Sequence, residues 1–257
     1  MTRPKLLDLF SCAGGAGKGY ADAGFDVYGV DKDRQRNYPF AFHEGDVVVV
    51  MESLLAGEKI PFKHRDGRIE LLGLDDFVAI HGSPPCQFGS ELTPDKTKHV
   101  NLIPQTRALA KATGLPYVIE NVRAVRPHLI NPVSLFGTMF DMHMVTSVGR
   151  RYVLSRERLF ETNWPLIAPH DPGPQGHPIA NVFGAHLRCR SGEHRTQGGT
   201  GRTKDFPGED KPTLARQLMQ MPWATMHEMS EAVPPPFTAF IGRQLKAWIA
   251  ARAVAAA

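Results

Sequence analysis

The sequence predicts an α/β protein built around a mostly parallel sheet. The chain opens with an apolar strand at 5–10, a glycine-rich turn at 11–17 and a helix that ends at Gly24. This order of elements opens a nucleotide-type βαβ unit. In open α/β sheets ligands bind at the carboxyl ends of the strands, so we expect a site there. Further apolar runs that read as strands occur at 26–31, 77–80 and 116–122.

Length and composition fit an ordinary globular protein. The 257 residues suffice for one large domain with or without a small appendage. We see no signal peptide and no apolar run long enough for a bilayer, so we expect a cytoplasmic protein with no membrane partner. Three widely spaced cysteines and no CxxC motif disfavour a zinc site or a disulfide framework, so no metal is expected. A net charge of +4 permits a polyanionic partner without requiring one.

The first two units carry features of a nucleotide site. The turn lacks the GxGxxG spacing of dinucleotide sites, and glycines also occur in such turns for steric reasons alone. Asp31 ends the second strand, where an acid commonly accepts hydrogen bonds from ribose hydroxyls. Its position alone is equally consistent with a solvated acid at the end of a strand. Asp46 precedes the apolar run 47–50 of a third unit, and as an acid at a strand edge it suits an adenine amino group.

Cys86 follows the strand at 77–80. Residues 82–85 (GSPP) end that strand, because proline lacks the N–H that a ladder needs. A thiol held rigidly at this edge is a candidate nucleophile. A buried structural cysteine is the alternative, and the polar neighbours Ser83 and Gln87 argue against it.

Glu120 lies at the carboxyl end of the strand at 116–122. Apolar residues precede it, so burial can raise the pKa of its carboxyl group. A solvated glutamate is the more common case, but a thiol and a carboxylic acid at one sheet edge form a catalytic constellation. The polar segment 88–101 between Cys86 and the helix expected at 102–113 is either a lid or a plain solvated loop.

The second half of the chain is more basic and less regular. A strand-like segment at 149–160 places Arg156 and Arg158 on one face, suited to phosphate or carbonyl oxygens unless it is simply a solvated basic strand. Residues 186–204 are rich in glycine and basic side chains, as in a phosphate-contacting surface. A helix after Pro234 carries an apolar stripe of Phe237, Phe240, Ile241, Leu245, Trp248 and Ile249, which is core packing.

Four motifs in order resemble those of the cytosine-5 DNA methyltransferases, in the compact form carried by phages and mobile elements. They are Asp8-Leu9-Phe10 with Ala13-Gly14-Gly15, then Pro85-Cys86-Gln87, Glu120-Asn121-Val122 and Arg156-Glu157-Arg158. The resemblance covers about residues 5–164 and 214–249. It implies a Rossmann-like S-adenosylmethionine-dependent methyltransferase fold. The catalytic domain would comprise 1–164 plus 214–257, with a short, irregular target-recognition region at 165–213.

The resemblance also implies roles for individual residues. Cys86 would attack C6 of a flipped-out cytosine in duplex DNA, Glu120 would hold N3, and Arg158 would contact the same base. Arg158 would also favour the thiolate of Cys86. S-adenosylmethionine would lie against Phe10, Cys12, Ala13, Gly14, Gly15, Asp31, Asp46, Val47 and Pro85. Contacts to DNA would come from Gln87, Ser90, Arg156, Arg188 and Arg190.

Three features depart from the family pattern. Cys12 stands where a glycine is usual, Glu231 stands near the expected cofactor site where an asparagine is usual, and the variable region is only about fifty residues. An RNA cytosine-5 methyltransferase, transfer of a different group from a modified sulfonium cofactor, and an inactive DNA-binding relative therefore stay open as alternatives. A dinucleotide oxidoreductase is weaker, because it does not explain the Pro85-Cys86-Gln87 motif.

Overall fold

The computed structural model describes residues 3–89, 100–189 and 205–255. Its large sheet has the strand order β5-β4-β3-β2-β1-β6-β7-β11-β8, and a second sheet has the order β13-β12-β10-β9. The strands are β1 Lys5–Leu9, β2 Asp26–Asp31, β3 Ala41–Glu44, β4 Ile60–Lys63, β5 Ile69–Leu72, β6 Phe77–Gly82, β7 Tyr117–Asn121, β8 Val133–Phe136, β9 His143–Val145, β10 Arg151–Leu154, β11 Glu157–Thr162, β12 Ile179–Phe183 and β13 His186–Cys189. The α-helices are α1 Gly15–Asp22, α2 Val47–Leu55, α3 Ile103–Ala112, α4 Lys211–Met219, α5 Met226–Glu231 and α6 Pro235–Ala255.

The centre of the large sheet is parallel. Strands β3, β2, β1, β6 and β7 pair in parallel, and antiparallel strands extend the sheet on both sides. The chain builds outward from β1 through β2 to β3, then crosses over to β6 and β7 on the other side of β1. The strand order therefore reverses between β1 and β6, and the crevice at such a switch point is where α/β sheets bind ligands.

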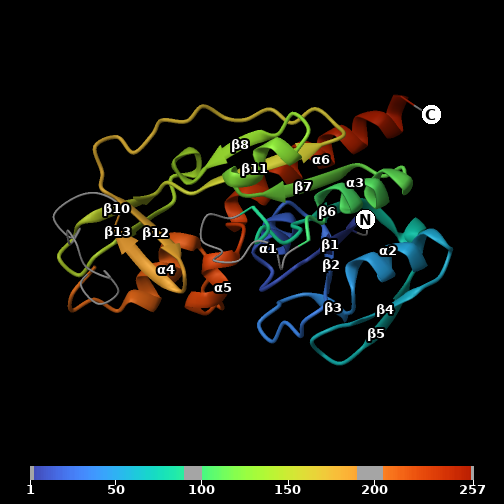
Figure 1. The fold of residues 1–257 in the computed structure, drawn as a ribbon, viewed down its shortest axis with the longest axis horizontal. Helices are drawn as coiled ribbons and strands as arrows, with labels where there is room; N and C mark the ends of the chain where they lie inside the picture. The colour runs from blue at the N-terminus through green and yellow to red at the C-terminus, as the bar shows by residue number, and fades with distance from the viewer. Residues whose placement is uncertain (1–2, 90–99, 190–204, 256–257) are drawn as a thin grey trace.

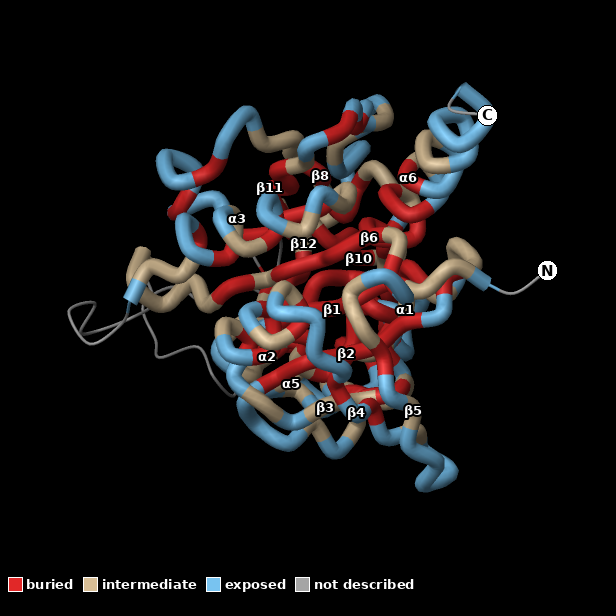
Figure 2. The backbone as a smooth tube through the Cα atoms, turned by 90° about the vertical axis from the view of Figure 1, so that its right-hand side faces the viewer, coloured by how far each residue is buried: buried red, intermediate tan, exposed pale blue. Residues whose placement is uncertain are grey.

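Alternating side chains of the parallel strands pack against two layers of helices. Leu6 and Ala79 belong to the core that includes residues of α1 and α6, whereas Leu7 and Ile80 belong to the core that includes residues of α2 and α3. Figure 2 shows β1, β2 and β6 as buried backbone through the middle of the molecule. Continuous apolar strands are the pattern expected of a sheet that is covered on both faces.

The second sheet lies beside the large one, with α4 and α5 packed on it (Figure 1). Its strands β9 and β10 precede residue 165, whereas β12 and β13 follow it. The second sheet is therefore built from both sides of the expected domain boundary. Parallel pairing of β10 with β12 joins the two parts.

Several predicted elements are confirmed, and two are wrong. The helices expected at 102–113 and after Pro234 are α3 and α6. The run 47–50 is not a strand but the start of α2, because Asp46 caps that helix by accepting from the N–H groups of Val48 and Val49. The single strand expected at 149–160 is two strands in two different sheets, β10 and β11.

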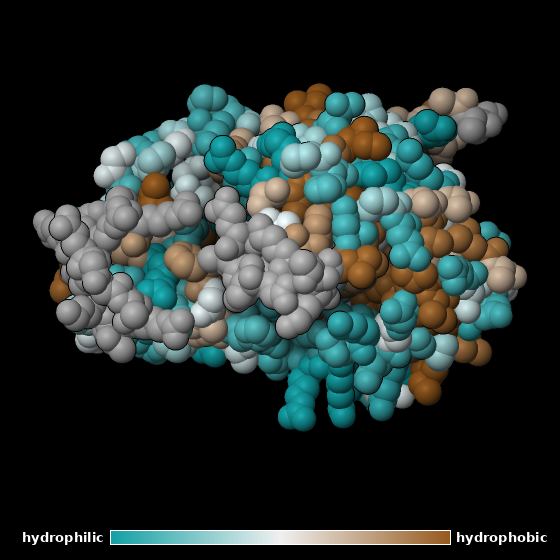
Figure 3. All heavy atoms as spheres, viewed as in Figure 1, coloured by the Kyte–Doolittle hydropathy of each residue, from teal (hydrophilic) through white to brown (hydrophobic). Residues whose placement is uncertain are grey.

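The surface is mixed. Figure 3 shows hydrophobic side chains gathered on the side of the molecule where Figure 1 places α2. Val49 of α2 and Ile69 and Leu71 of β5 are among the large apolar side chains that stay more than half exposed. Within the described ranges, no helix has the length and apolar character of a membrane-spanning segment.

Candidate active site

Cys86 lies just past the carboxyl end of β6, beside the switch point. The N–H of Ser83 donates to the carbonyl of Leu9, which continues the pairing of β6 with β1 beyond Gly82. The side-chain amide of Asn121 donates to the carbonyl of Pro84 at 2.8 Å. Contacts from β1 and β7 therefore fix the two residues that precede Pro85, and the half-buried thiol follows on a stiff loop.

Glu120 and Arg158 form an ion pair at the same edge. Glu120 is the penultimate residue of β7 and follows Ile119, which pairs with Gly82 of β6. Arg158 comes from β11. The guanidinium Nε lies 2.9 Å from the carboxylate Oε1, and both side chains are at least nine-tenths buried. Burial raises the pKa of Glu120, and Arg158 and a hydrogen bond from Ser83 oppose this rise. The net effect is a pKa for Glu120 above the usual value of a glutamate.

The thiol of Cys86 is not activated by this arrangement alone. Burial and the nearby Glu120 raise its pKa, and Arg158 lowers it. The expected effect of Arg158 has the right sign, but burial and the acid that Arg158 pairs with outweigh it. In the protein without a ligand, the surroundings of Cys86 therefore favour the thiol over the thiolate.

The glycine-rich turn is shaped by contacts within the protein. A side chain at Gly15 would place its Cβ 2.3 Å from the carbonyl oxygen of Val233, so this glycine allows the segment before α6 to approach α1. Gly14 has φ +80° and would meet Tyr38 and Pro39. Steric reasons thus suffice for both glycines, whether or not the turn also holds a ligand.

The rest of the turn is strained. Phe10 and Cys12 have positive φ values of 55° and 44°, a region that favours glycine. Asp31 stabilises this conformation by accepting from the N–H of Cys12 at 2.9 Å. Ala13 is buried, and its carbonyl accepts from the indole of Trp223. Strain of this kind is typical of functional turns.

The acids expected to bind a nucleoside lie where the sequence predicts. Asp31 ends β2 and is nearly buried, with each carboxylate oxygen accepting one backbone N–H. Asp46 is exposed two residues after β3, and Val47 is buried as the first residue of α2. The run after Asp46 is a helix and not the expected strand, but Asp46 still follows the carboxyl end of a strand, β3.

Several buried polar atoms in this crevice have no hydrogen-bond partner, and others lie in the second sheet, at Arg151, Asn181 and Arg188. Among the described residues, those of the crevice include Asp8 Oδ1, Ser11 Oγ and Gln87 Oε1, and Glu120 Oε1 has its ion pair alone. These residues lie at the ends of β1, β6 and β7, around the switch point. Leaving such atoms unsatisfied is unfavourable, so their clustering indicates a place where a polar ligand completes the bonding. The residues fit a polar, nucleoside-containing cofactor in this crevice.

Arg156 is not placed to contact DNA. It lies between β10 and β11, and its buried guanidinium donates to the carbonyls of Met229, Ala232, Ser230 and Val182. It joins the large sheet to β12 and to the end of α5. The strand-face prediction failed because the chain leaves one sheet and enters the other at this residue.

Of the remaining predicted DNA contacts, the structure describes Gln87 and Arg188. Gln87 and Pro85 flank Cys86 and are half-buried. Arg188 lies on β13 with its guanidinium 5.7 Å from the centre of the Phe183 ring. Ser90 and Arg190 lie outside the described residues. Glu231 is exposed at the end of α5, and its charge raises the pKa values of Cys12 and Cys86.

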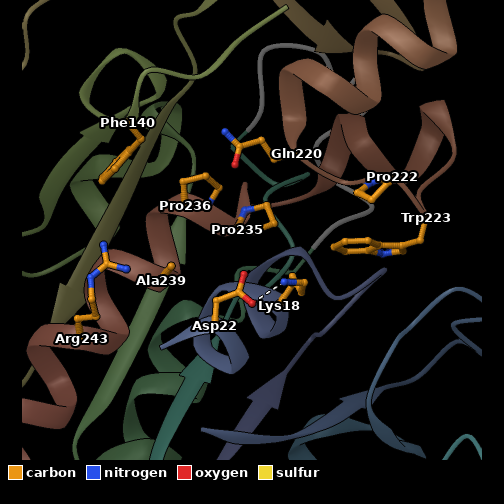
Figure 4. A pocket seen from close by; sticks show the side chains of 10 residues that line it. All are labelled: Lys18, Asp22, Phe140, Gln220, Pro222, Trp223, Pro235, Pro236, Ala239 and Arg243. Carbon is orange, nitrogen blue, oxygen red and sulfur yellow. Dashed lines mark hydrogen bonds and ion pairs between the residues drawn. The ribbon is translucent and has the colours of Figure 1, made fainter. Parts of the chain in front are cut away.

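A separate hollow of about 540 Å³ lies between α1, α6 and the α4–α5 connection (Figure 4). Lys18 and Asp22 form an ion pair on the α1 side of this hollow, and Trp223 and Arg243 also line it. None of the predicted catalytic residues lines it.

Sequence reasoning missed several polar residues of the crevice. Asp8 and Tyr38 form a buried pair in which the phenol donates to the carboxyl group at 3.1 Å. Burial raises the pKa of Asp8 to about 8, although the bond from Tyr38 lowers it. Asn121 holds the Pro84 carbonyl, and His81 is fully buried on β6. For Asp8, His81 and Asn121 the sequence did hold a signal, because each is a polar residue within an otherwise apolar strand.

Comparison with solved structures defines the fold. The chain matches an E. coli protein described as a candidate DNA modification methyltransferase encoded within a prophage, with 13% identity, TM-score 0.50 and coverage of 95% of this chain and 99% of that one. It matches Spodoptera frugiperda DNMT2 with 12% identity, TM-score 0.54 and coverage of 95% and 99%. It matches S. pombe Dnmt2 methyltransferase with 10% identity, TM-score 0.51 and coverage of 96% and 99%.

No family model and no curated protein matches the sequence. The class that these likenesses establish is the methyltransferase fold, as the sequence predicts.

Proposed function

We propose that this protein is a methyltransferase that transfers a methyl group from S-adenosylmethionine to C5 of a cytosine flipped out of duplex DNA. The observation that carries the proposal is the convergence of Cys86, Glu120 and Arg158 at the switch point of a methyltransferase fold. A buried acid paired with arginine beside a thiol has little value for packing, because burying these groups is unfavourable.

The cofactor is expected in the crevice at the ends of β1, β2 and β3. Asp31 would bind the ribose, Asp46 and Val47 the adenine, and the turn from Phe10 to Gly15 the methionine part. Pro85 would border the methyl group from the other side. When bound, S-adenosylmethionine supplies an electrophilic methyl group to C5.

Cys86 provides the nucleophile. Its thiolate adds to C6 of cytosine, and the electron pair of the C5–C6 double bond becomes available at C5, which is otherwise a poor nucleophile. After C5 has gained the methyl group, loss of its proton to a base returns the electron pair, and the thiolate leaves from C6. Cys86 therefore ends the cycle unchanged.

Glu120 stabilises the charge that this addition pushes into the ring. With a raised pKa, its carboxyl group can share a proton with N3 of cytosine. Arg158 holds the carboxyl group in place and would contact the same base. A stacked base cannot reach these groups, so the cytosine has to be extruded from the helix.

A trapping experiment tests this proposal. Protein and S-adenosylmethionine are mixed with duplex DNA that carries 5-fluorocytosine, beside Cys86→Ser, and run on a denaturing gel. Fluorine at C5 blocks the final elimination, so we expect a covalent complex that requires Cys86 and the cofactor. A trap that forms only on RNA would move the protein to RNA substrates. The absence of a trap on either polymer would contradict the proposal.

We further propose that residues 165–213 contribute to target recognition through Arg188 and Arg190. Replacing both with glutamate should weaken DNA binding and make it less dependent on salt, by about one unit of the logarithmic slope for each phosphate that is no longer neutralised. The measurement is the dissociation constant at several salt concentrations, with Arg243→Glu on α6 as a control. An unchanged slope would remove this segment from the interface.

A further inference from the structure

The start of α5 is tied to both loops that border the proposed cofactor crevice. The indole N–H of Trp223, just before α5, donates to the carbonyl of Ala13 in the glycine-rich turn at 2.9 Å. In the loop that follows Asp31, the amide Nδ2 of Asn37 lies 2.9 and 3.0 Å from the two carboxylate oxygens of Glu228 on α5. This second contact joins residues that are 191 positions apart, and in Figure 1 the loop between β2 and β3 reaches toward α5.

The carboxylate of Glu228 is held in place to receive Asn37. Its Oε2 accepts from the backbone N–H of Thr225 at 2.7 Å, and the N–H of Glu228 donates to the hydroxyl of Thr225 at 3.3 Å. This reciprocal pair is a capping box, which turns the carboxylate back toward the start of the helix. Because the capping box already fixes the carboxylate, little side-chain freedom is lost when Asn37 binds it.

The loop that carries Asn37 also lies against the glycine-rich turn. A Cβ on Gly14 would lie 2.8 Å from the ring of Pro39 and 2.9 Å from the ring of Tyr38. The loop thus runs from Asp31, the acid expected to bind ribose, to the turn expected to hold the methionine part. Asn37 joins this loop to α5, so the contact with Glu228 crosses from one wall of the crevice to another.

We propose that the hydrogen bonds between Asn37 and Glu228 form a latch across the crevice, which opens to admit S-adenosylmethionine and to release the demethylated cofactor. The inference rests on the cofactor site proposed above and not on the identity of the methyl acceptor. Neither residue touches the reacting atoms. Both act on the rates at which the cofactor enters and leaves.

The latch is a tie that water can replace. At the other end of α5, the buried guanidinium of Arg156 donates to three carbonyls between residues 229 and 232. In contrast, both Asn37 and Glu228 are half-buried, so water can take over their hydrogen bonds when they part. We therefore expect the loop to separate from α5 at the latch, while Arg156 keeps the helix attached to the junction.

Exchanging the two polar groups tests the latch. Asn37→Asp places an acid against Glu228 and should open the latch, whereas Glu228→Gln keeps a partner for Asn37 and an oxygen for the N–H of Thr225. In the double variant Asn37→Asp/Glu228→Gln, the amide and the carboxylate have changed sides, so the latch should form again. Asn37→Ser breaks the contact by shortening the side chain, and it carries the test if Asn37→Asp does not fold.

The measurement is the binding and release of tritiated S-adenosylmethionine by the full chain without DNA. A latch slows entry and exit alike, so Asn37→Asp and Asn37→Ser should raise both rate constants by about tenfold, the value of one hydrogen bond to a charged group, and leave Kd nearly unchanged. Glu228→Gln and the double variant should stay close to the wild type. A residue that merely supports the site would instead weaken Kd through faster release alone, and that outcome would overturn the proposal.

Ser147→Asp is the matched control. The hydroxyl of Ser147, between β9 and β10, donates to Glu209 at 2.8 Å, so this change also places an acid against a glutamate that joins two distant segments. It should leave both rate constants unchanged. Unchanged rates in Asn37→Asp and Asn37→Ser, or a double variant that stays as fast as Asn37→Asp, would refute the latch.

These outcomes separate the latch from the proposed function. A failed DNA trap together with the expected rates would refute methyl transfer to DNA cytosine and leave the latch standing. A trap that forms, with equal rates in all variants, would refute the latch alone. Wild-type protein that binds no S-adenosylmethionine would refute both.

Discussion

The crevice at the switch point and the junction around Arg156 bury polar groups in opposite ways. In the crevice, Asp8, Ser11 and Gln87 each keep a buried atom without a hydrogen-bond partner among the described residues. At the junction, the guanidinium of Arg156 is spread over four backbone carbonyls. In the crevice these atoms lie beside the switch point at which α/β sheets bind ligands, so a ligand is their expected partner, whereas the complete bonding of Arg156 is that of a structural joint. Two arginines that are two residues apart thus differ in their surroundings: Arg158 pairs with Glu120 in the crevice, and Arg156 joins the two sheets.

The largest expected effect is on the crevice side of this comparison. Cys86→Ala should lower turnover by at least about 10³-fold, because in the proposed reaction Cys86 forms the bond to C6. The unfolding transition should change little, since the thiol is only half-buried. Methyl transfer and urea unfolding measure the two effects, with Cys189→Ala in the second sheet as the control for activity. Retained turnover would remove Cys86 from the mechanism.

The junction should show the reverse pattern. Arg156→Met should destabilise the fold by about 3 kcal/mol, because it orphans several buried carbonyls that each cost about 1–3 kcal/mol, while relief of the buried charge offsets part of this loss. Arg151→Met, on the adjoining strand, breaks a pair with the exposed Asp141 and should cost less than about 1 kcal/mol. Equal effects of the two changes on urea unfolding would contradict the structural role of Arg156.

The same contrast explains what the sequence could and could not predict. Strands β1, β2, β6 and β7 were predictable because each is a local apolar run, and Cys86 and Glu120 were found because they follow such runs. The second sheet was not predictable, because β10 pairs with β12 only after the chain has passed through β11 of the large sheet and the irregular segment that follows it. Arg156 was misplaced for the same reason: its partners lie 26 to 76 residues away along the chain. Asn37 and Glu228 meet only in the folded state.

Asp8 offers a smaller, pH-dependent test of the crevice. The pKa of this acid rises from 3.8 to about 8 on folding, so the folded state binds more protons than the unfolded state between these values. Its contribution to stability therefore falls as pH rises through this window, by up to about 1.4 kcal/mol per pH unit. Asp8→Asn should remove this pH dependence, so the stability of the variant relative to the wild type should increase from pH 5 to pH 8.

Urea unfolding at several pH values checks the Asp8 prediction. Asp22→Asn changes an exposed acid on α1 and should give the wild-type slope. Other groups contribute to the pH dependence of stability in both the wild type and Asp8→Asn. One is His81, whose lowered pKa makes stability fall as pH drops below about 6.5. The difference between Asp8→Asn and the wild type cancels these contributions. Parallel curves would show that Asp8 is ionised in the folded protein.

The smallest effect concerns the strained turn that borders the crevice. Cys12 has φ 44°, a conformation that costs a side chain about 1–2 kcal/mol and glycine almost nothing. Glycine loses about 0.5–1 kcal/mol more backbone entropy on folding, so Cys12→Gly should stabilise the protein by about 0.5–1 kcal/mol. Gly14→Ala should do the opposite, since its Cβ would lie 2.8 Å from Pro39 at φ +80°. Thermal unfolding of both variants measures the two effects. If Cys12→Gly destabilises the fold, then the thiol is held by contacts worth more than the strain, and this turn belongs with the junction as a structural joint.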